Sequence, residues 1–120
     1  MMLKVNEQIL IITDNDDSPI VKNLLKKRIF PLTRSSILSS LELIKHVEIK
    51  IIVLDKSHKT VDTIEFILNV RDVKSEILIF LPKEFTNYSE WSTLKKMENI
   101  RTYDGDSISF EEKYVVKRKF

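Results

Sequence analysis

Short apolar runs alternate along the chain with longer segments in which apolar residues recur every three or four positions. Residues 9–12 and 51–54 contain no polar side chain at all, and both runs are too short for a helix. Such runs are typical of strands that are covered on both faces of a parallel sheet, whereas the longer segments have the period of amphipathic helices. The alternation predicts a series of βα units that build one parallel sheet.

Five such units account for residues 1–120, and the length and the hydrophobic fraction of 42% suit one domain with one core. Strands are expected at residues 8–13, 30–34, 50–54, 76–81 and 100–103. Helices are expected at residues 18–28, 36–44, 61–70, 89–98 and 110–120. With right-handed crossovers, this pattern predicts an α/β fold, namely a doubly wound five-stranded parallel sheet in the flavodoxin-like order 2-1-3-4-5 with helices on both faces.

Local signals support the beginnings of two of these helices. Ser18 can cap the first helix, and Pro19 suits its first position, where the missing N–H of proline would have no partner anyway. Ser109 and Glu112 have the spacing of a capping box, which favours a helix from residue 110 to the last residue.

Carboxylates follow two of the apolar runs at the point where each strand ends. Asp55 comes directly after residues 51–54, and Asp14 begins an acidic segment, residues 14–17, after the first strand. The carboxyl ends of parallel strands meet at one edge of the sheet, where ligands bind in open α/β folds. The pattern therefore predicts an acidic pocket at that edge. Taken alone, Asp55 also suits the cap of a turn, and residues 14–17 also suit a solvated loop.

Composition and charge narrow the classes of function. Cysteine is absent, which excludes disulfides, thiolate metal sites and cysteine nucleophiles. The net charge is only +2, so the composition does not favour nucleic acid as a partner, and the basic segment at residues 117–119 suits the end of a helix. Gly105 is the single glycine, so there is no glycine-rich phosphate loop and no case for a nucleotide-binding enzyme.

No apolar run in the sequence approaches the roughly 20 residues that a membrane span requires. The chain is therefore expected to be soluble and cytoplasmic, without a membrane partner. His46 and His58 are expected to be surface residues rather than a metal-binding pair.

The arrangement of acids and strands resembles the receiver domain of bacterial two-component response regulators, over nearly the whole chain. Asp55 ends the third strand, as the phosphoacceptor does in receivers, and residues 39–55 look like the second receiver helix running into that strand without a gap. The residues that match the receiver spacing after this acid are Asp62, Glu65, Val70 and Arg71.

The resemblance implies a phosphorylation site. By this likeness Asp55 is the phosphoacceptor, and Mg²⁺ is held by Asp55, by Asp14 and by the backbone carbonyl of Ser57. Hard oxygen ligands of this kind suit Mg²⁺. The upstream partner that the resemblance implies is a sensor histidine kinase.

Three positions depart from the receiver pattern. Thr13 takes the place of the first member of the acidic pair. Pro82 takes the place of the hydroxyl residue after the fourth strand, and Asp104 takes the place of the lysine after the fifth. A rival register makes residues 114–117 the fifth strand and Lys117 the active-site lysine, at the expense of the capping box and the closing helix.

These observations favour a receiver-like signalling module that acts by protein–protein interaction, has degenerate phosphorylation machinery and is not an enzyme. The alternative is a working receiver that is phosphorylated on Asp55 by a histidine kinase with Mg²⁺. A scaffold that retains only the fold is a third class.

The expected partner is a sensor kinase, a downstream signalling protein or a second copy bound through the face of the fourth helix, fifth strand and fifth helix. Tyr103 and Tyr114 are the candidate anchors of this interface. The aromatic residues of this region, some of which are expected to be exposed, are Tyr88, Trp91, Tyr103, Phe110, Tyr114 and Phe120.

Overall fold

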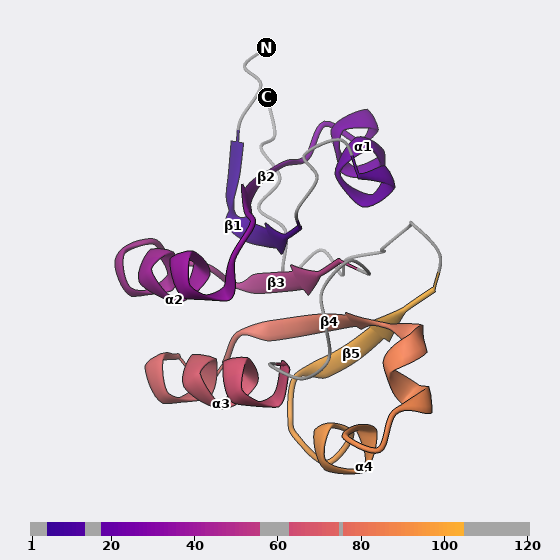
Figure 1. The fold of residues 1–120 in the computed structure, drawn as a ribbon. Helices are drawn as coiled ribbons and strands as arrows, with labels where there is room; N and C mark the ends of the chain where they lie inside the picture. The colour runs from indigo at the N-terminus through magenta and orange to yellow at the C-terminus, as the bar shows by residue number, and fades with distance from the viewer. Residues whose placement is uncertain (1–4, 14–17, 56–62, 75, 105–120) are drawn as a thin grey trace.

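A computed structural model of the protein describes residues 5–13, 18–55, 63–74 and 76–104. Five strands form one sheet in the order β2-β1-β3-β4-β5, and every neighbouring pair is parallel (Figure 1). The strands are β1 (Val5–Ile12), β2 (Phe30–Arg34), β3 (Ile51–Leu54), β4 (Leu78–Pro82) and β5 (Ile100–Tyr103). The helices are α1 (Pro19–Lys26), α2 (Ile37–His46), α3 (Thr63–Val73), the 3₁₀ helix η2 (Lys83–Asn87) and α4 (Trp91–Leu94). The predicted α/β class, the parallel sheet and the strand order are confirmed.

The central strands β1 and β3 are apolar because both of their faces are covered. Ile9 pairs with Ile51 and the register continues to Ile12 and Leu54. The eight paired residues, 9–12 and 51–54, are all fully buried. Successive side chains of a strand point to opposite faces, so each strand sends alternate residues into two separate cores.

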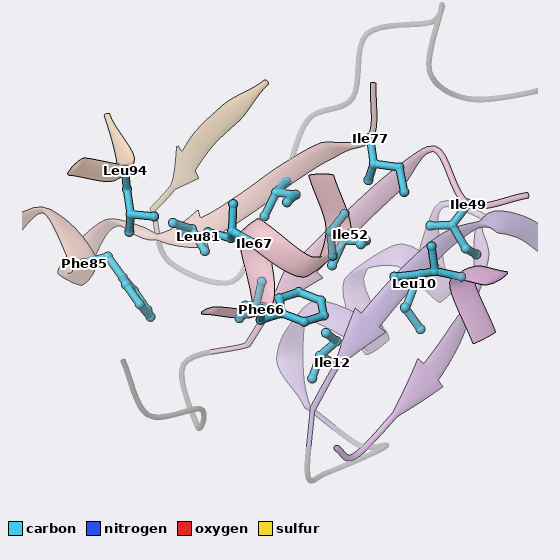
Figure 2. Close-up of a cluster of buried hydrophobic side chains, with 14 residues drawn as sticks. Leu10, Ile12, Ile49, Ile52, Phe66, Ile67, Ile77, Leu81, Phe85 and Leu94 are labelled. Carbon is cyan, nitrogen blue, oxygen red and sulfur yellow. The ribbon is translucent and has the colours of Figure 1, made fainter. Parts of the chain in front are cut away.

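One core lies between the sheet and the helices α2, α3 and α4 (Figure 2). Phe66 of α3 is fully buried in it and lies among side chains from β1, β3 and β4. The buried members of this core are Leu10, Ile12, Ile44, Ile49, Ile52, Leu54, Phe66, Ile67, Val70, Ile77, Ile79, Leu81, Phe85 and Leu94.

The second core lies on the opposite face, under α1. It takes the odd-numbered residues of β1 and β3 and the even-numbered residues of β4, as the alternation of side chains requires. Its buried members are Ile9, Ile11, Ile20, Val21, Leu24, Ile51, Val53, Leu78, Phe80 and Tyr103. The described helices therefore cover both faces of the sheet.

The first helix begins and ends at well-defined caps. The Ser18 hydroxyl accepts a hydrogen bond from the Val21 amide at 3.4 Å, and proline occupies the first turn, as predicted. At the other end, the amides of Arg28 and Ile29 donate to Leu25 and Leu24, each at 2.9 Å. This is the bond pattern of a Schellman motif, and it places Arg28 in the left-handed region at a φ of 63°.

The fourth helix is shorter than predicted. Within the predicted range of residues 89–98, the α-helical part is the single turn Trp91–Leu94, and the 3₁₀ helix η2 precedes that range. The hydroxyls of Thr86 and Ser92 donate to nearby backbone carbonyls at 2.8 and 3.0 Å. Such local bonds compete with a regular helix. The predicted helix over residues 110–120 lies outside the described residues.

Arg71, at the end of α3, joins three segments of backbone. Its guanidinium donates to the Ile77 carbonyl at 2.9 Å and to the Glu98 carbonyl at 2.7 Å, with a longer bond of 3.4 Å to Asn99. Burial lowers the pKa of Arg71, and the negative charge of Glu76 and Glu98 acts in the opposite direction. Arginine stays charged throughout the physiological range, so its donor groups are not lost by titration there.

Within the described part of the chain, no helix has both the length and the apolar character that a membrane crossing requires. The longest of these helices is α3, with 11 residues.

Replacement of Arg28 by glycine is expected to stabilise the protein. The left-handed conformation costs a non-glycine residue about 1 kcal/mol, and glycine adopts it freely. The Arg28→Gly variant should unfold at a higher urea concentration than the wild type, with an unchanged slope. Lys27→Gly is the matched control, because Lys27 has a φ of −86° and should lose stability. Destabilisation by Arg28→Gly of the same size as in the control would contradict the prediction.

Candidate functional site

Asp55 lies where the sequence predicts it, at the carboxyl end of the central strand β3. The residue is 8% exposed. Its amide donates to the Ile12 carbonyl at 3.0 Å, so the parallel ladder with β1 extends up to the acid. The carboxylate is therefore held at the edge of the sheet where ligands bind in this fold class.

Thr13 lies beside Asp55, one residue beyond β1. Its hydroxyl donates to Oδ2 of Asp55 at 2.7 Å, and Thr13 is only 2% exposed. The register that pairs Ile12 with Leu54 brings these two residues together, with both side chains on the α1 face. A hydrogen bond to a carboxylate is stronger than one between neutral groups, so the hydroxyl fixes the orientation of the acid. By the resemblance to receivers, a second carboxylate is expected at position 13.

Pro82 interrupts the hydrogen-bond ladder between β3 and β4. The Leu78 amide donates to the Lys50 carbonyl at 3.0 Å, whereas the next amide, of Ile79, donates towards β5, to Asn99, at 2.9 Å. Amides along a strand point alternately to the two neighbouring strands, so position 82 faces β3 like position 78. The acceptor at that point of the ladder is the Leu54 carbonyl, but proline has no N–H to donate.

Tyr103 donates the bond that Pro82 cannot make. Its hydroxyl lies 2.7 Å from the Leu54 carbonyl oxygen, although Tyr103 belongs to β5 and Leu54 to β3. Tyr103 is paired with Pro82 in the register of β4 and β5, and it is only 5% exposed. The prediction that Tyr103 anchors a surface interface is wrong, because the ring belongs to the core under α1.

Asp104 follows β5 at the same edge of the sheet. Its Oδ2 lies 3.7 Å from Nζ of Lys83, the first residue after β4, and both side chains are mostly exposed. Such exposed pairs contribute little to stability. The neighbour of β4 is Ile100–Tyr103, so the rival register with the fifth strand at residues 114–117 is wrong. Lys117 itself lies outside the described residues.

The described part of this edge holds one of the predicted metal ligands. Asp55 is present, whereas Asp14 and Ser57 lie outside the described residues. Among residues 5–13, 18–55, 63–74 and 76–104, no group of three or more His, Asp or Glu side chains could hold a metal ion. Mg²⁺ usually keeps several waters and takes one or two carboxylates. Asp55 supplies one such carboxylate, and the other predicted ligands lie outside the described residues, so the Mg²⁺ site stays a prediction.

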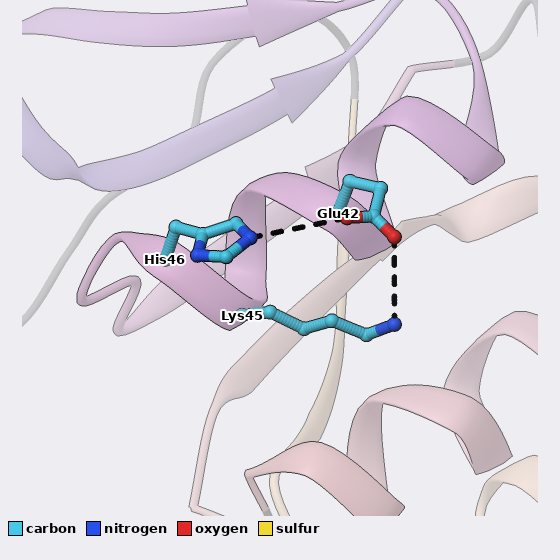
Figure 3. Close-up of polar contacts among 3 residues, drawn as sticks. All are labelled: Glu42, Lys45 and His46. Atoms are coloured by element: carbon cyan, nitrogen blue, oxygen red, sulfur yellow. Dashed lines mark hydrogen bonds and ion pairs between the residues drawn. The ribbon is translucent and has the colours of Figure 1, made fainter.

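The predicted surface position of His46 is confirmed. It lies on the outer face of α2, where its Nε2 is 3.9 Å from Glu42 and its side chain is 76% exposed. Lys45 contacts the same carboxylate at 3.5 Å (Figure 3). This cluster is a solvated helix face. His58 lies outside the described residues.

The predicted aromatic surface is present in part. Tyr88 is 45% exposed and contacts the edge of the buried Phe85 ring, with 5.7 Å between the ring centroids. Trp91 is half-buried against the core under α2 and α3. The other aromatic residues named for this face, Phe110, Tyr114 and Phe120, lie outside the described residues.

Removal of the Thr13 hydroxyl is expected to destabilise the protein. Thr13→Val keeps the shape of the side chain but loses the bond to Asp55, and bonds to charged groups are worth about 1.5–3 kcal/mol. Thr13→Ser keeps the hydroxyl and loses only a methyl group, at about 0.8 kcal/mol. Urea unfolding at neutral pH should therefore rank the valine variant below the serine variant, and the reverse order would contradict the role of the hydroxyl.

Comparison of the chain with protein-family models, with curated proteins and with solved structures finds no match to any of them. The likeness to receivers therefore rests on residue spacing, on the strand order and on the position of Asp55 in the sheet.

Proposed function

We propose that the protein is a cytoplasmic, receiver-like signalling module that acts by binding another protein and whose phosphorylation machinery is degenerate. The observation that carries the proposal is Asp55, a largely buried acid held by Thr13 at the carboxyl end of the central strand. Asp and Glu side chains are mostly exposed in folded proteins, whereas Asp55 is largely buried and accepts a hydrogen bond from the Thr13 hydroxyl.

The residues around Asp55 support the degenerate form. Thr13 donates a hydrogen bond where a receiver has an acid, and Pro82 offers no hydroxyl and no N–H at the end of β4. At the end of β5, Asp104 stands in place of the cation and is paired with Lys83. A carboxylate near an acyl phosphate would repel it, while Thr13 lacks the metal-binding carboxylate and Pro82 lacks the hydroxyl of a receiver. Each of the three substitutions would therefore weaken the chemistry of phosphorylation.

The second candidate is a working phosphoacceptor. It is favoured by Asp55 itself, which keeps some exposure to solvent at the ligand-binding edge. In that reaction an oxygen of Asp55 attacks the phosphorus of a phosphohistidine or an acyl phosphate, and the bond from phosphorus to the donor breaks as the donor leaves. Mg²⁺ held with Asp14 and Ser57 would supply charge stabilisation.

The proposed partner surface is the region of α4 and β5. Tyr88 is exposed there, and Lys95, Lys96 and Arg101 are exposed nearby. Aromatic and arginine side chains supply much of the energy of protein interfaces. A downstream signalling protein, a sensor kinase or a second copy of the chain could use this surface.

Treatment with a phosphoryl mimic separates the two candidates. Amide NMR spectra of the protein are expected to show no saturable shifts near Asp55 when Mg²⁺ and beryllofluoride are added at millimolar concentration. Asp55→Asn is the control for non-specific effects. Saturable shifts in the wild type that vanish in Asp55→Asn would favour the working phosphoacceptor and contradict the degenerate form.

A gain of Mg²⁺ binding is expected when an acid is placed at position 13. Thr13→Asp adds a second carboxylate beside Asp55. The pair of carboxylates suits Mg²⁺, and the two carboxylates repel each other when Mg²⁺ is absent. The variant should be less stable than the wild type without Mg²⁺ and should be stabilised when Mg²⁺ is added. Thr13→Asn, with the same shape and no charge, should not respond. An equal response of both variants would contradict the match of position 13 to the acidic pair.

A further inference from the structure

The peptide unit that precedes Asp55 is held at both ends. Its carbonyl, which belongs to Leu54, accepts the Tyr103 hydroxyl at 2.7 Å. Its N–H, which belongs to Asp55, donates to the Ile12 carbonyl at 3.0 Å. The orientation of this peptide plane sets the direction in which the Asp55 side chain leaves the backbone.

We propose that Tyr103 is a positioning residue for Asp55, and that its hydroxyl replaces the backbone N–H that Pro82 removes from the sheet. The proposal concerns how the site is held and does not depend on whether Asp55 accepts phosphate.

The pairing of the strands explains why residue 103 can reach this carbonyl. Tyr103 lies opposite Pro82 in the register of β4 and β5, and an amide at position 82 would face the Leu54 carbonyl in the ladder of β3 and β4. The ring packs in the core under α1 with Val53 and Phe80, and so spans β4 on that face. From there the Tyr103 hydroxyl reaches the Leu54 carbonyl, to which Pro82 of β4 offers no N–H.

The Leu54 carbonyl is more favourable with a hydrogen-bond donor than without one. Leu54 and Tyr103 are both buried, and a buried polar group without a partner is costly. A phenol hydroxyl can rotate to meet the acceptor, whereas the proline ring excludes a donor from β4 itself.

One consequence concerns the movement of β5. The bond joins β5 to the residue next to Asp55 across an intervening strand. A movement of the end of β5 relative to the acid would have to break this bond.

A double-mutant cycle between positions 82 and 103 tests the replacement. Tyr103→Phe keeps the ring and removes the donor, so in the wild-type background it should raise the equilibrium constant for unfolding roughly fivefold to hundredfold. Pro82→Ala restores an N–H that faces Leu54. In the Pro82→Ala background, Tyr103→Phe should change this constant by no more than about twofold, because the carbonyl keeps a partner.

An NMR measurement separates positioning from stability alone. Tyr103→Phe should shift the Asp55 amide resonance in the folded protein, and Pro82→Ala combined with Tyr103→Phe should move it back towards the wild-type position. Tyr88→Phe, which removes the same hydroxyl from an exposed ring, should leave that resonance in place. None of these measurements uses a phosphodonor, Mg²⁺ or a partner, so their failure is distinct from failure of the proposed function.

Two results would overturn the proposal. The first is an effect of Tyr103→Phe that is equal in both backgrounds, since the hydroxyl would then not replace the missing N–H. The second is fast hydrogen exchange at the new amide of Pro82→Ala, since position 82 would then not face Leu54. The exchange measurement requires only that Pro82→Ala folds. Slow exchange at its new amide supports the proposal.

Discussion

β1 and β3 pair side by side in the centre of the sheet, and neither strand carries a polar side chain over the paired residues. This pairing joins segments about forty residues apart in sequence and supplies apolar side chains to both cores. The closure of so long a loop has to be offset by burial, which these strands provide on both faces. The same register brings Thr13 beside Asp55, so the site exists because the central pair is formed correctly. A slip of one residue would send Asp55 to the face of α2 and α3.

Pro82 is an unusual residue for its position in the sheet. Proline is normally confined to edge strands, to the first residue of a strand or to bulges, whereas β4 lies between β3 and β5 and Pro82 is its last residue. The hydroxyl of Tyr103 accounts for this exception, because it occupies the acceptor that the proline leaves. At the opposite ends of β4 and β5, Arg71 of α3 binds the carbonyls that precede the two strands.

The fold was predictable from the sequence because its signals are local and strong. The apolar runs of β1 and β3 and the cap formed by Ser18 and Pro19 each have one structural reading. The position of Asp55 followed from the carboxyl-end rule for parallel sheets. The length of α4 was not predictable from apolar spacing alone, because the Ser92 hydroxyl bonds to the local backbone there.

The contacts of Thr13 and Tyr103 were less accessible to sequence reasoning. Thr13 was recognised as a departure from a family pattern, but its bond to Asp55 depends on the register between β1 and β3. The sequence makes Tyr103 a candidate interface residue because aromatic residues are frequent near it. Its burial follows from the face on which residue 103 points, and that face is fixed only when β5 is paired with β4. A proline at the end of an inner strand was the available signal that a side chain must supply a donor.

Trp91 is the single tryptophan of the chain, and it is half-buried on the one α-turn of α4. The turns around it close through bonds between residues three apart, such as that from the Trp91 amide to the Tyr88 carbonyl at 3.0 Å. Short elements of this kind often open with a lower free energy than the sheet beneath them. The intrinsic fluorescence of this protein therefore observes the α4 segment, while circular dichroism observes the remaining helices and the sheet. Agreement between the two signals during denaturation would show that α4 unfolds together with the rest of the protein.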